Sequence, residues 1–266
     1  MILVQLTDTH VRPLGRAAHR TAETNMLTER ALRSVARLRI RPDAVLLTGD
    51  LTDNGLESEY AVLAEMLQRY INVPIYAIPG NHDARKSMRA VLSHLPGVND
   101  DPDFIHYAVE TLPMRLVMLD TLIPGSGAGE QCPARLAWLD RTLAAAPNRP
   151  TIVAMHHPPF VTGMAHMDAI GLNNREAFAE VIARHKQVER ILSGHVHRPI
   201  VGRVAHAIAS ISPSAAHQLE FTLGNDPGAW NLEPAAFQVH ALVSGGLVSH
   251  TVYVENFPGP YPFTDS

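Results

Sequence analysis

The chain has 266 residues, of which 46% are hydrophobic and 18% charged, and this composition is typical of a globular protein with a sizeable core. Its formal net charge of -4 argues against polymeric nucleic acid as a partner, because surfaces that bind nucleic acid are normally basic. A single cysteine excludes an intrachain disulfide. No apolar run approaches the ~20 residues of a membrane span, so we expect a cytoplasmic protein with no membrane partner.

Short apolar runs rich in β-branched residues alternate with segments of helical spacing over the first 200 residues. Strands buried on both faces are predicted at 2–6, 43–47, 74–78, 115–119, 151–155 and 190–193. Helices are predicted at 23–40, 57–70, 86–94, 134–146 and 174–185. This alternation is typical of a largely parallel α/β core whose sheets are covered by helices.

The pattern changes after about residue 200. The stretches "IVGRVAHAIAS", "AAFQVHALVS" and "LVSHTVYVEN" alternate in the manner of antiparallel strands, and "SGG" at 244–246 is a plausible hairpin turn between the last two. We expect a single domain over residues 1–266. Its last part, from about 200 to 266, would add late strands and small elements for a cap or for contacts in a homo-oligomer, a dimer or larger.

Potential metal ligands follow five of the predicted strands. They are Asp8 and His10, Asp50, Asn81 with His82, His156 with His157, and His195 with His197. Each motif alone is weak, because an isolated aspartate after a strand is more often a helix cap or a turn residue. Open α/β sheets place sites at the carboxyl ends of their strands, so the five motifs together predict one shared cleft.

The donor set indicates two metal ions. Oxygen and imidazole donors without thiolate suit Fe, Mn, Zn or Co better than a structural zinc site or an iron–sulfur cluster. Seven side chains are too many for one catalytic ion but fit two ions that share a bridging carboxylate. Two ions ~3.5–4 Å apart form a clamp for in-line phosphoryl chemistry. The seven are Asp8, His10, Asp50, Asn81, His156, His195 and His197.

The stretch "GHVH" at 194–197 raises the question of whether its histidines act on one ion or on two. In an extended chain, His195 and His197 would project to one side while Val196 turns away, and their Cα atoms would lie ~6.6 Å apart. That span fits two ions better than one. We therefore expect the two histidines to bind different ions.

These motifs resemble those of the calcineurin-like metallophosphoesterases over residues 1 to about 200. The matching residues are Asp8-x-His10, Gly49-Asp50, Gly80-Asn81-His82-Asp83, His156 and Gly194-His195-x-His197. The stretch "HHPPFVTGMAHMDAIGL" at 156–172 and the compact length resemble the bacterial class III cyclic nucleotide phosphodiesterases and the related glycerophosphodiesterases. The resemblance implies an α/β fold, a four-layer α-β-β-α sandwich of two mixed sheets flanked by helices.

The resemblance also assigns roles to individual residues. It implies that Asp50 is catalytic and bridges the two ions. His82, which is not a ligand, would face the substrate and act as a catalytic acid or hydrogen-bond donor. Asn81 and His217 would lie against the substrate, although His217 could also be an ordinary loop histidine. The implied ligands are Asp8, His10 and His197 for the first ion and Asn81, His156 and His195 for the second.

The expected function is hydrolysis of a small phosphodiester, a 3′,5′-cyclic nucleotide such as cAMP or a glycerophosphodiester, by a metal-bound hydroxide. The alternatives are a phosphomonoesterase or a nuclease of the same superfamily. A metal-binding scaffold without activity is disfavoured because every expected ligand is present. Outside the ligand set, we expect His157 to be structural, and Arg12 either to contact substrate phosphate or to form a surface salt bridge.

Overall fold

The computed structural model describes residues 1–263 and contains two large mixed β-sheets. The first sheet has the strand order β15–β14–β1–β2–β3. Its strands are β1 (Ile2–Leu6), β2 (Ala44–Thr48), β3 (Ile75–Ile78), β14 (Ala236–Val243) and β15 (Gly246–Tyr253). The three N-terminal strands are parallel, and β14 pairs antiparallel with both β1 and β15.

The second sheet has the order β10–β11–β9–β7–β5–β4. Its strands are β4 (Tyr107–Val109), β5 (Arg115–Leu119), β7 (Thr151–Met155), β9 (Val188–Ser193), β10 (Ile200–Val204) and β11 (Ala207–Ile211). The four inner strands are parallel, and the edge strands β4 and β10 run antiparallel to their neighbours. The remaining strands form two small two-stranded sheets. They pair β6 (Gly129–Glu130) with β8 (Leu172–Asn173), and β12 (Gln218–Leu219) with β13 (Trp230–Asn231).

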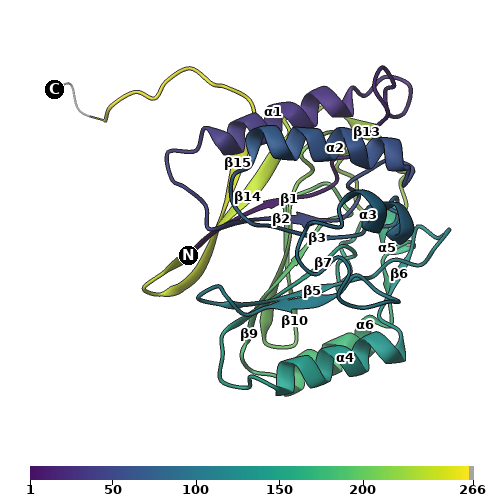
Figure 1. The fold of residues 1–266 in the computed structure, drawn as a ribbon, viewed down its shortest axis with the longest axis vertical. Coiled ribbons are helices and arrows are strands. Elements are labelled where there is room, and N and C mark those ends of the chain that lie inside the picture. The colour runs from purple at the N-terminus through teal and green to yellow at the C-terminus, as the bar shows by residue number, and fades with distance from the viewer. Residues whose placement is uncertain (264–266) are drawn as a thin grey trace.

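Helices cover the outer face of each sheet, so the molecule has four layers (Figure 1). The helices are α1 (Thr24–Ala36), α2 (Glu57–Tyr70), α3 (Arg85–Val91), α4 (Pro133–Ala144), α5 (Ala165–Asp168) and α6 (Arg175–Arg184). Figure 1 shows α1 and α2 on the first sheet and α4 and α6 on the second, with the sheets between them. The predicted α-β-β-α sandwich is confirmed.

The alternation of side chains along β5 shows how the layers are held together. Leu116 and Met118 belong to the core that includes the first sheet and its helices, whereas Val117 and Leu119 pack with α4 and α6. Because successive side chains of a strand point to opposite faces, a continuously apolar strand can fill two cores at once. This is why the inner strands have no polar alternation in the sequence.

The element boundaries match the sequence-based predictions closely. The predicted strands at 2–6, 115–119 and 151–155 and the predicted helix at 57–70 coincide with β1, β5, β7 and α2. The helix predicted at 23–40 ends at Ala36, because Arg39, Ile40 and Arg41 are exposed and offer no apolar face to the sheet. The predicted hairpin turn joins β14 to β15, where Val243 pairs with Gly246.

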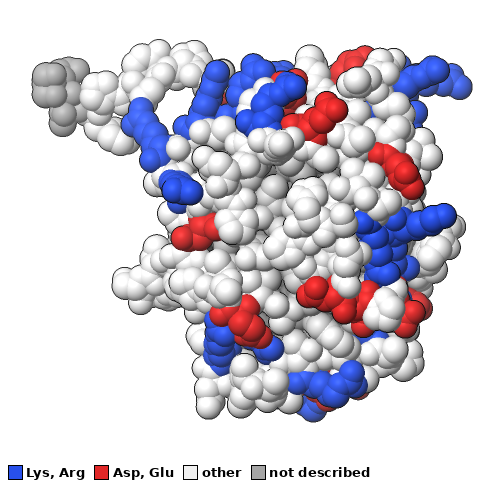
Figure 2. Space-filling view, in the orientation of Figure 1, with Lys and Arg blue, Asp and Glu red and all other residues white. Residues whose placement is uncertain are grey.

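The late strands extend both sheets, since β10 and β11 join the second and β14 and β15 the first. Their use as a cap or as an oligomer contact stays a prediction. None of the helices within residues 1–263 combines the length and hydropathy that a bilayer-spanning segment requires. Figure 2 shows basic and acidic side chains next to one another around one face, with few charges near its centre.

Candidate metal centre

The seven predicted metal ligands lie together where strand ends of the two sheets meet. Short backbone hydrogen bonds connect the loops that carry them: the N–H of Asp8 donates to the carbonyl of Gly49, and the N–H of Gly194 donates to the carbonyl of His156, each at 3.0 Å. The N–H of His195 donates to the Asp8 carboxylate at 3.1 Å. Asp8, in the loop that follows β1 of the first sheet, thus fixes the loop that follows β9 in the second.

The backbone at these loops is unusual. The non-glycine residues with positive φ within the described chain are Asp8, His10, His19, Arg20, Asp50, Asn174, His195, His197 and Ala205. Five of these nine are predicted metal ligands. Residues other than glycine rarely adopt a positive φ, and the backbone strain that it causes is concentrated at functional sites.

The expectation of an extended "GHVH" segment is wrong. His195 and His197 have φ values of 73° and 53°, which lie in the left-handed region. The two side chains reach the site because the backbone turns twice, and Val196 is buried between them. His197 contacts Asp8 and His10, whereas the ring of His195 lies 5.1 Å from that of His156, and binding to different ions stays a prediction.

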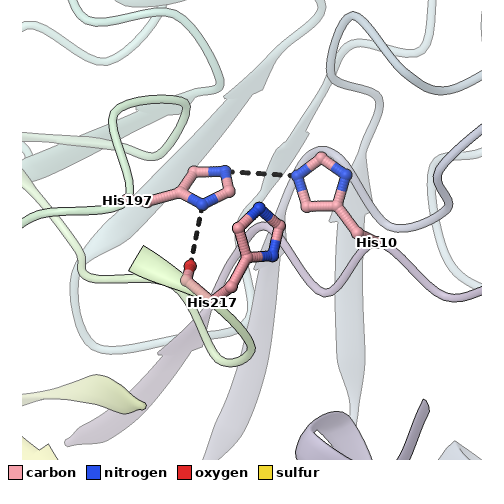
Figure 3. Close-up of side chains that lie close together, drawn as sticks. All are labelled: His10, His197 and His217. Carbon is pink, nitrogen blue, oxygen red and sulfur yellow. Dashed lines mark hydrogen bonds between the residues drawn. The ribbon is translucent and has the colours of Figure 1, made fainter. Parts of the chain in front are cut away.

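The first group of ligands contains Asp8, His10 and His197. The Nε2 atom of His197 lies 3.3 Å from Oδ1 of Asp8 and 3.2 Å from Nε2 of His10. The Nδ1 of His197 donates to the carbonyl of His217 at 2.9 Å, as Figure 3 shows, and the Nδ1 of His10 lies 3.3 Å from Oδ1 of Asp53. Because the Nδ1 atom of each histidine contacts an oxygen outside the ligand group, the Nε2 lone pairs of both are directed into the site.

The second group contains Asn81, His156 and His195. The Nε2 of His156 lies 3.1 Å from Oδ1 of Asn81, and its Nδ1 donates to the carbonyl of Thr48 at 2.8 Å. The Nε2 of His195 donates to the carbonyl of Ile170 at 3.1 Å, so Nδ1 is the nitrogen left for a metal. A backbone carbonyl therefore orients both imidazoles, as is usual for metal-binding histidines.

Asp50 lies between the two groups. Its Oδ2 is 3.7 Å from Nε2 of His10 in the first group and 3.4 Å from Nε2 of His156 in the second. Burial opposes its ionisation, yet His156 and His82 hold the pKa of Asp50 well below the ordinary value. The carboxylate is therefore charged, and it faces imidazoles on both sides.

The residues present fit divalent metal ions. Asp8 and Asp50 are 0% and 2% exposed, and within residues 1–263 neither carboxylate has a lysine or arginine partner. Buried carboxylates are costly unless a charge compensates them. Two imidazole lone pairs 3.2 Å apart also repel unless a proton or a cation lies between them, and metal–nitrogen bonds of ~2.0–2.1 Å accommodate that separation.

Comparison with known proteins identifies the family of this chain. The family model of the calcineurin-like phosphoesterases matches residues 1–199. The chain belongs to the calcineurin-like phosphoesterase family.

Relatives support the narrower resemblance as well. A probable glycerophosphodiester phosphodiesterase, GpdQ, of Arcobacter nitrofigilis is 33% identical, over 99% of this chain and 97% of its own. A probable cyclic nucleotide phosphodiesterase of Rhodopseudomonas palustris is 38% identical, over 94% of this chain and 91% of its own. A dimetal phosphatase from Danio rerio has the same fold, with a TM-score of 0.67 at 15% identity over 96% of this chain and 99% of its own. The predicted superfamily and relatives are confirmed.

His82 occupies the open side of the phosphoesterase site. Its Nδ1 donates to the carbonyl of Asp53 at 2.8 Å, which leaves Nε2 free on a side chain that is 37% exposed. Its ring lies edge-on to the ring of His10, 4.7 Å between centroids. Burial lowers the pKa of His82, but the charges of Asp50 and Asp53 outweigh it and raise the pKa overall.

His157 is structural, as the sequence predicted. Its Nε2 donates to the carbonyl of Gly127 at 3.1 Å, and its Nδ1 accepts from the hydroxyl of Thr121 at 2.8 Å. Burial, followed by the nearby His156, lowers the pKa of His157 to about 3. Both ring nitrogens are occupied, so this neutral imidazole has no lone pair to offer a metal.

Sequence reasoning missed the role of Asp53. Its carbonyl orients His82, and its carboxylate contacts His10 and accepts a 2.9 Å hydrogen bond from Arg12. Burial works in the other direction, but the contacts with His10, His82 and Arg12 lower the pKa of Asp53 to about 2. The signal was available, since Asp53 follows Asp50 by three residues in "TGDLTD". Of the two alternatives for Arg12, the structure shows a salt bridge, but it is partly buried and not on the surface, with Arg12 and Asp53 22% and 14% exposed.

His217 lies beside the first group of ligands (Figure 3). Its ring centroid is 4.7 Å from that of His197 and 5.2 Å from that of His10, and it is almost fully buried. Burial, with His197 and His10 nearby, lowers the pKa of His217 far below its ordinary value. Within the described residues its Nδ1 has no hydrogen-bond partner, so this nitrogen is available to a ligand of the site.

Proposed function

We propose that this phosphoesterase hydrolyses small phosphodiesters with the aid of two divalent metal ions. Its family and its relatives make the chain a metal-dependent phosphodiesterase. The observation that carries the use of two ions is the position of Asp50, whose carboxylate faces one group of ligands on each side. If only one ion were bound, one of the two groups of side chains would have no cation to bind.

In this proposal Asp50 would contribute to both ions, and the other ligands would divide by group. Asp8, His10 and His197 would hold the first ion, and Asn81, His156 and His195 the second. The donors are oxygen and imidazole nitrogen, which favour Fe, Mn, Zn or Co. When bound, such a pair provides Lewis acidity and activates water at neutral pH.

The side chains of the protein carry the remaining roles. Asn81 holds its amide at the edge of the site and would help to position the phosphate. His82, fixed through Nδ1, presents Nε2 toward the cleft and would donate a proton or a hydrogen bond to an oxygen of the substrate. General acid catalysis of this kind typically contributes ~10²–10⁴-fold to the rate. His217 would contact the substrate from the opposite side of the first group.

The names of the relatives, which refer to glycerophosphodiesters and to cyclic nucleotides, support a small diester as the substrate. We propose a cyclic nucleotide such as cAMP or a glycerophosphodiester. A phosphomonoesterase or a nuclease would use the same ligands. A polynucleotide is disfavoured by the net charge of -4, and a scaffold without activity by the complete ligand set.

The test compares four substrates with protein purified with its metals retained: 3′,5′-cyclic AMP, 2′,3′-cyclic AMP, glycerophosphoethanolamine and a phosphomonoester. We expect at least one diester to be turned over with the highest kcat/KM. Preference for the monoester would overturn the proposal.

A further inference from the structure

Three aromatic rings form a continuous group that leads from the metal ligands toward solvent. The ring of His217 lies beside His197, and its centroid is 5.1 Å from that of His19. The ring of His19 in turn stacks on Trp230, with 5.2 Å between centroids and an interplanar angle of 26°. Trp230 also lies edge-on to His217 at 5.6 Å. His19 is exposed and Trp230 is partly buried. Neither outer residue belongs to the motifs of the metal site.

His19 is held in place by a strained turn. His19 and Arg20 have φ values of 46° and 69°, and the turn is closed by two 2.8 Å hydrogen bonds between Ala18 and Ala22. Neither His19 nor Arg20 is a predicted metal ligand, but the ring of His19 contacts that of His217 beside the first group. No hydrogen bond to the side chain of His19 within residues 1–263 compensates for the strain. Strain of this kind is characteristic of ligand clamps.

A cavity of about 570 Å³ opens beside this turn. Its lining includes His19, Arg16 and Arg20, and also Asp53, which contacts His10 and orients His82. Within the described chain neither of these two arginines has an acidic partner. The volume falls in the range of small-molecule sites, ~300–1,000 Å³. The cavity thus combines the His19 ring, which Trp230 backs by stacking, with the cationic side chains of Arg16 and Arg20.

We infer that His19 and Trp230 form a stacking subsite for the base of a nucleoside-bearing phosphodiester. The inference rests on the proposed function, because it assigns one arm of the diester to this cavity while the phosphate lies at the metal ligands. Aromatic side chains bind bases by stacking of π-faces, which tolerates any base. An aliphatic arm such as glycerol has no face to stack, so the subsite favours cyclic nucleotides over glycerophosphodiesters.

The first test is kinetic and uses two variants. His19→Asn keeps a residue that tolerates positive φ, and Trp230→Leu removes the larger ring. We expect each variant to raise KM for 3′,5′-cyclic AMP about tenfold, with KM for glycerophosphoethanolamine within twofold of the wild type. Trp138→Phe is the matched control, because Trp138 stacks on His106 beside α4 and should leave both substrates unchanged. Equal effects on the two substrates, or no effect on either, would overturn the inference.

The second test measures binding without turnover. Adenosine 5′-monophosphate should quench the tryptophan fluorescence of the purified protein and of the Trp138→Phe variant, but not of Trp230→Leu. Equal quenching by ribose 5-phosphate, or quenching that persists in Trp230→Leu, would contradict a base subsite. These results differ from those expected if the proposed function itself were wrong. In that case no diester would be hydrolysed, although adenosine 5′-monophosphate would still quench the fluorescence.

Discussion

The backbone N–H of His82 donates a 2.8 Å hydrogen bond to Oδ1 of Asp50. The other oxygen of the same carboxylate lies 3.4 Å from Nε2 of His156. This arrangement requires glycine at position 80, because a Cβ there would overlap Oδ1 of Asp50. The residue predicted to bridge the ions therefore also positions the residue predicted to face the substrate. A change at Asp50 is expected to affect both functions.

Replacement of Asp50 tests the bridging role. Asp50→Asn keeps the shape of the side chain but removes the charge that faces both groups of ligands. We expect the variant to retain fewer than two ions per chain and to lose at least ~100-fold in diester hydrolysis. Metal analysis and turnover measure the two effects, and Asp103→Asn, on an exposed loop, is the control. Full activity with both ions retained would show that Asp50 does not bridge.

Replacement of His82 separates proton donation from phosphate contact. His82→Gln should leave metal content unchanged, because Nε2 of His82 points to the open side of the site. We expect a loss of ~10²-fold for an alkyl diester, whose leaving oxygen needs a proton, and a loss below tenfold for an activated aryl diester. Turnover of the two substrates gives the ratio, with the exposed His94→Gln as control. Equal losses would assign His82 a phosphate contact instead.

Asp83 and Tyr60 hold the loops that carry the ligands. The buried carboxylate of Asp83 accepts hydrogen bonds from the backbone of Leu51 and Gly80 and, at 2.7 Å, from the hydroxyl of Tyr60. Tyr60→Phe removes that donor inside the core, and we expect the free energy of unfolding to fall by ~1–3 kcal/mol. Urea denaturation measures the change, with the exposed Tyr253→Phe as control. Unchanged stability would mean that the backbone donors suffice.

A buried histidine outside the predicted ligand set predicts a dependence of stability on pH. Burial, and to a lesser extent the charge of Arg190, lowers the pKa of His240 from its ordinary 6.5 to about 3. As the pH falls, His240 is therefore protonated in the unfolded chain before it is protonated in the folded chain. Its contribution to stability is complete above pH 6.5 and is lost as the pH falls toward 3. Each unit of difference corresponds to ~1.4 kcal/mol.

The variant His240→Gln should remove part of this dependence. Glutamine can keep polar contacts with Gln5 and Ser249, which hydrogen-bond the histidine at 3.1 and 2.8 Å. We expect the free energy of unfolding of the variant to vary less between pH 6.5 and pH 4 than that of the wild type, by urea denaturation. The exposed His250→Gln in the same hairpin is the control. Parallel pH profiles for wild type and His240→Gln would contradict the assignment.

Most of the fold, and the clustering of the candidate ligands, could be predicted from the sequence. The inner strands are continuous apolar runs, and candidate ligands directly follow five of them, so their position after the strands predicted that they would lie together. The geometry of "GHVH" could not be predicted in this way, because positive φ at two histidines leaves no mark in hydrophobic periodicity. The contact between His19 and Trp230 was missed for a similar reason: it joins two loops that are remote in sequence and carry no repeated motif.

Metal stoichiometry tests the central claim most directly. The protein is stripped with a chelator and then dialysed against increasing concentrations of Mn²⁺, while bound metal and diester hydrolysis are measured on the same samples. We expect binding to reach two ions per chain, with hydrolysis absent in the stripped protein and complete only when the second ion is bound. Full hydrolysis with one ion per chain, or with none, would contradict the account.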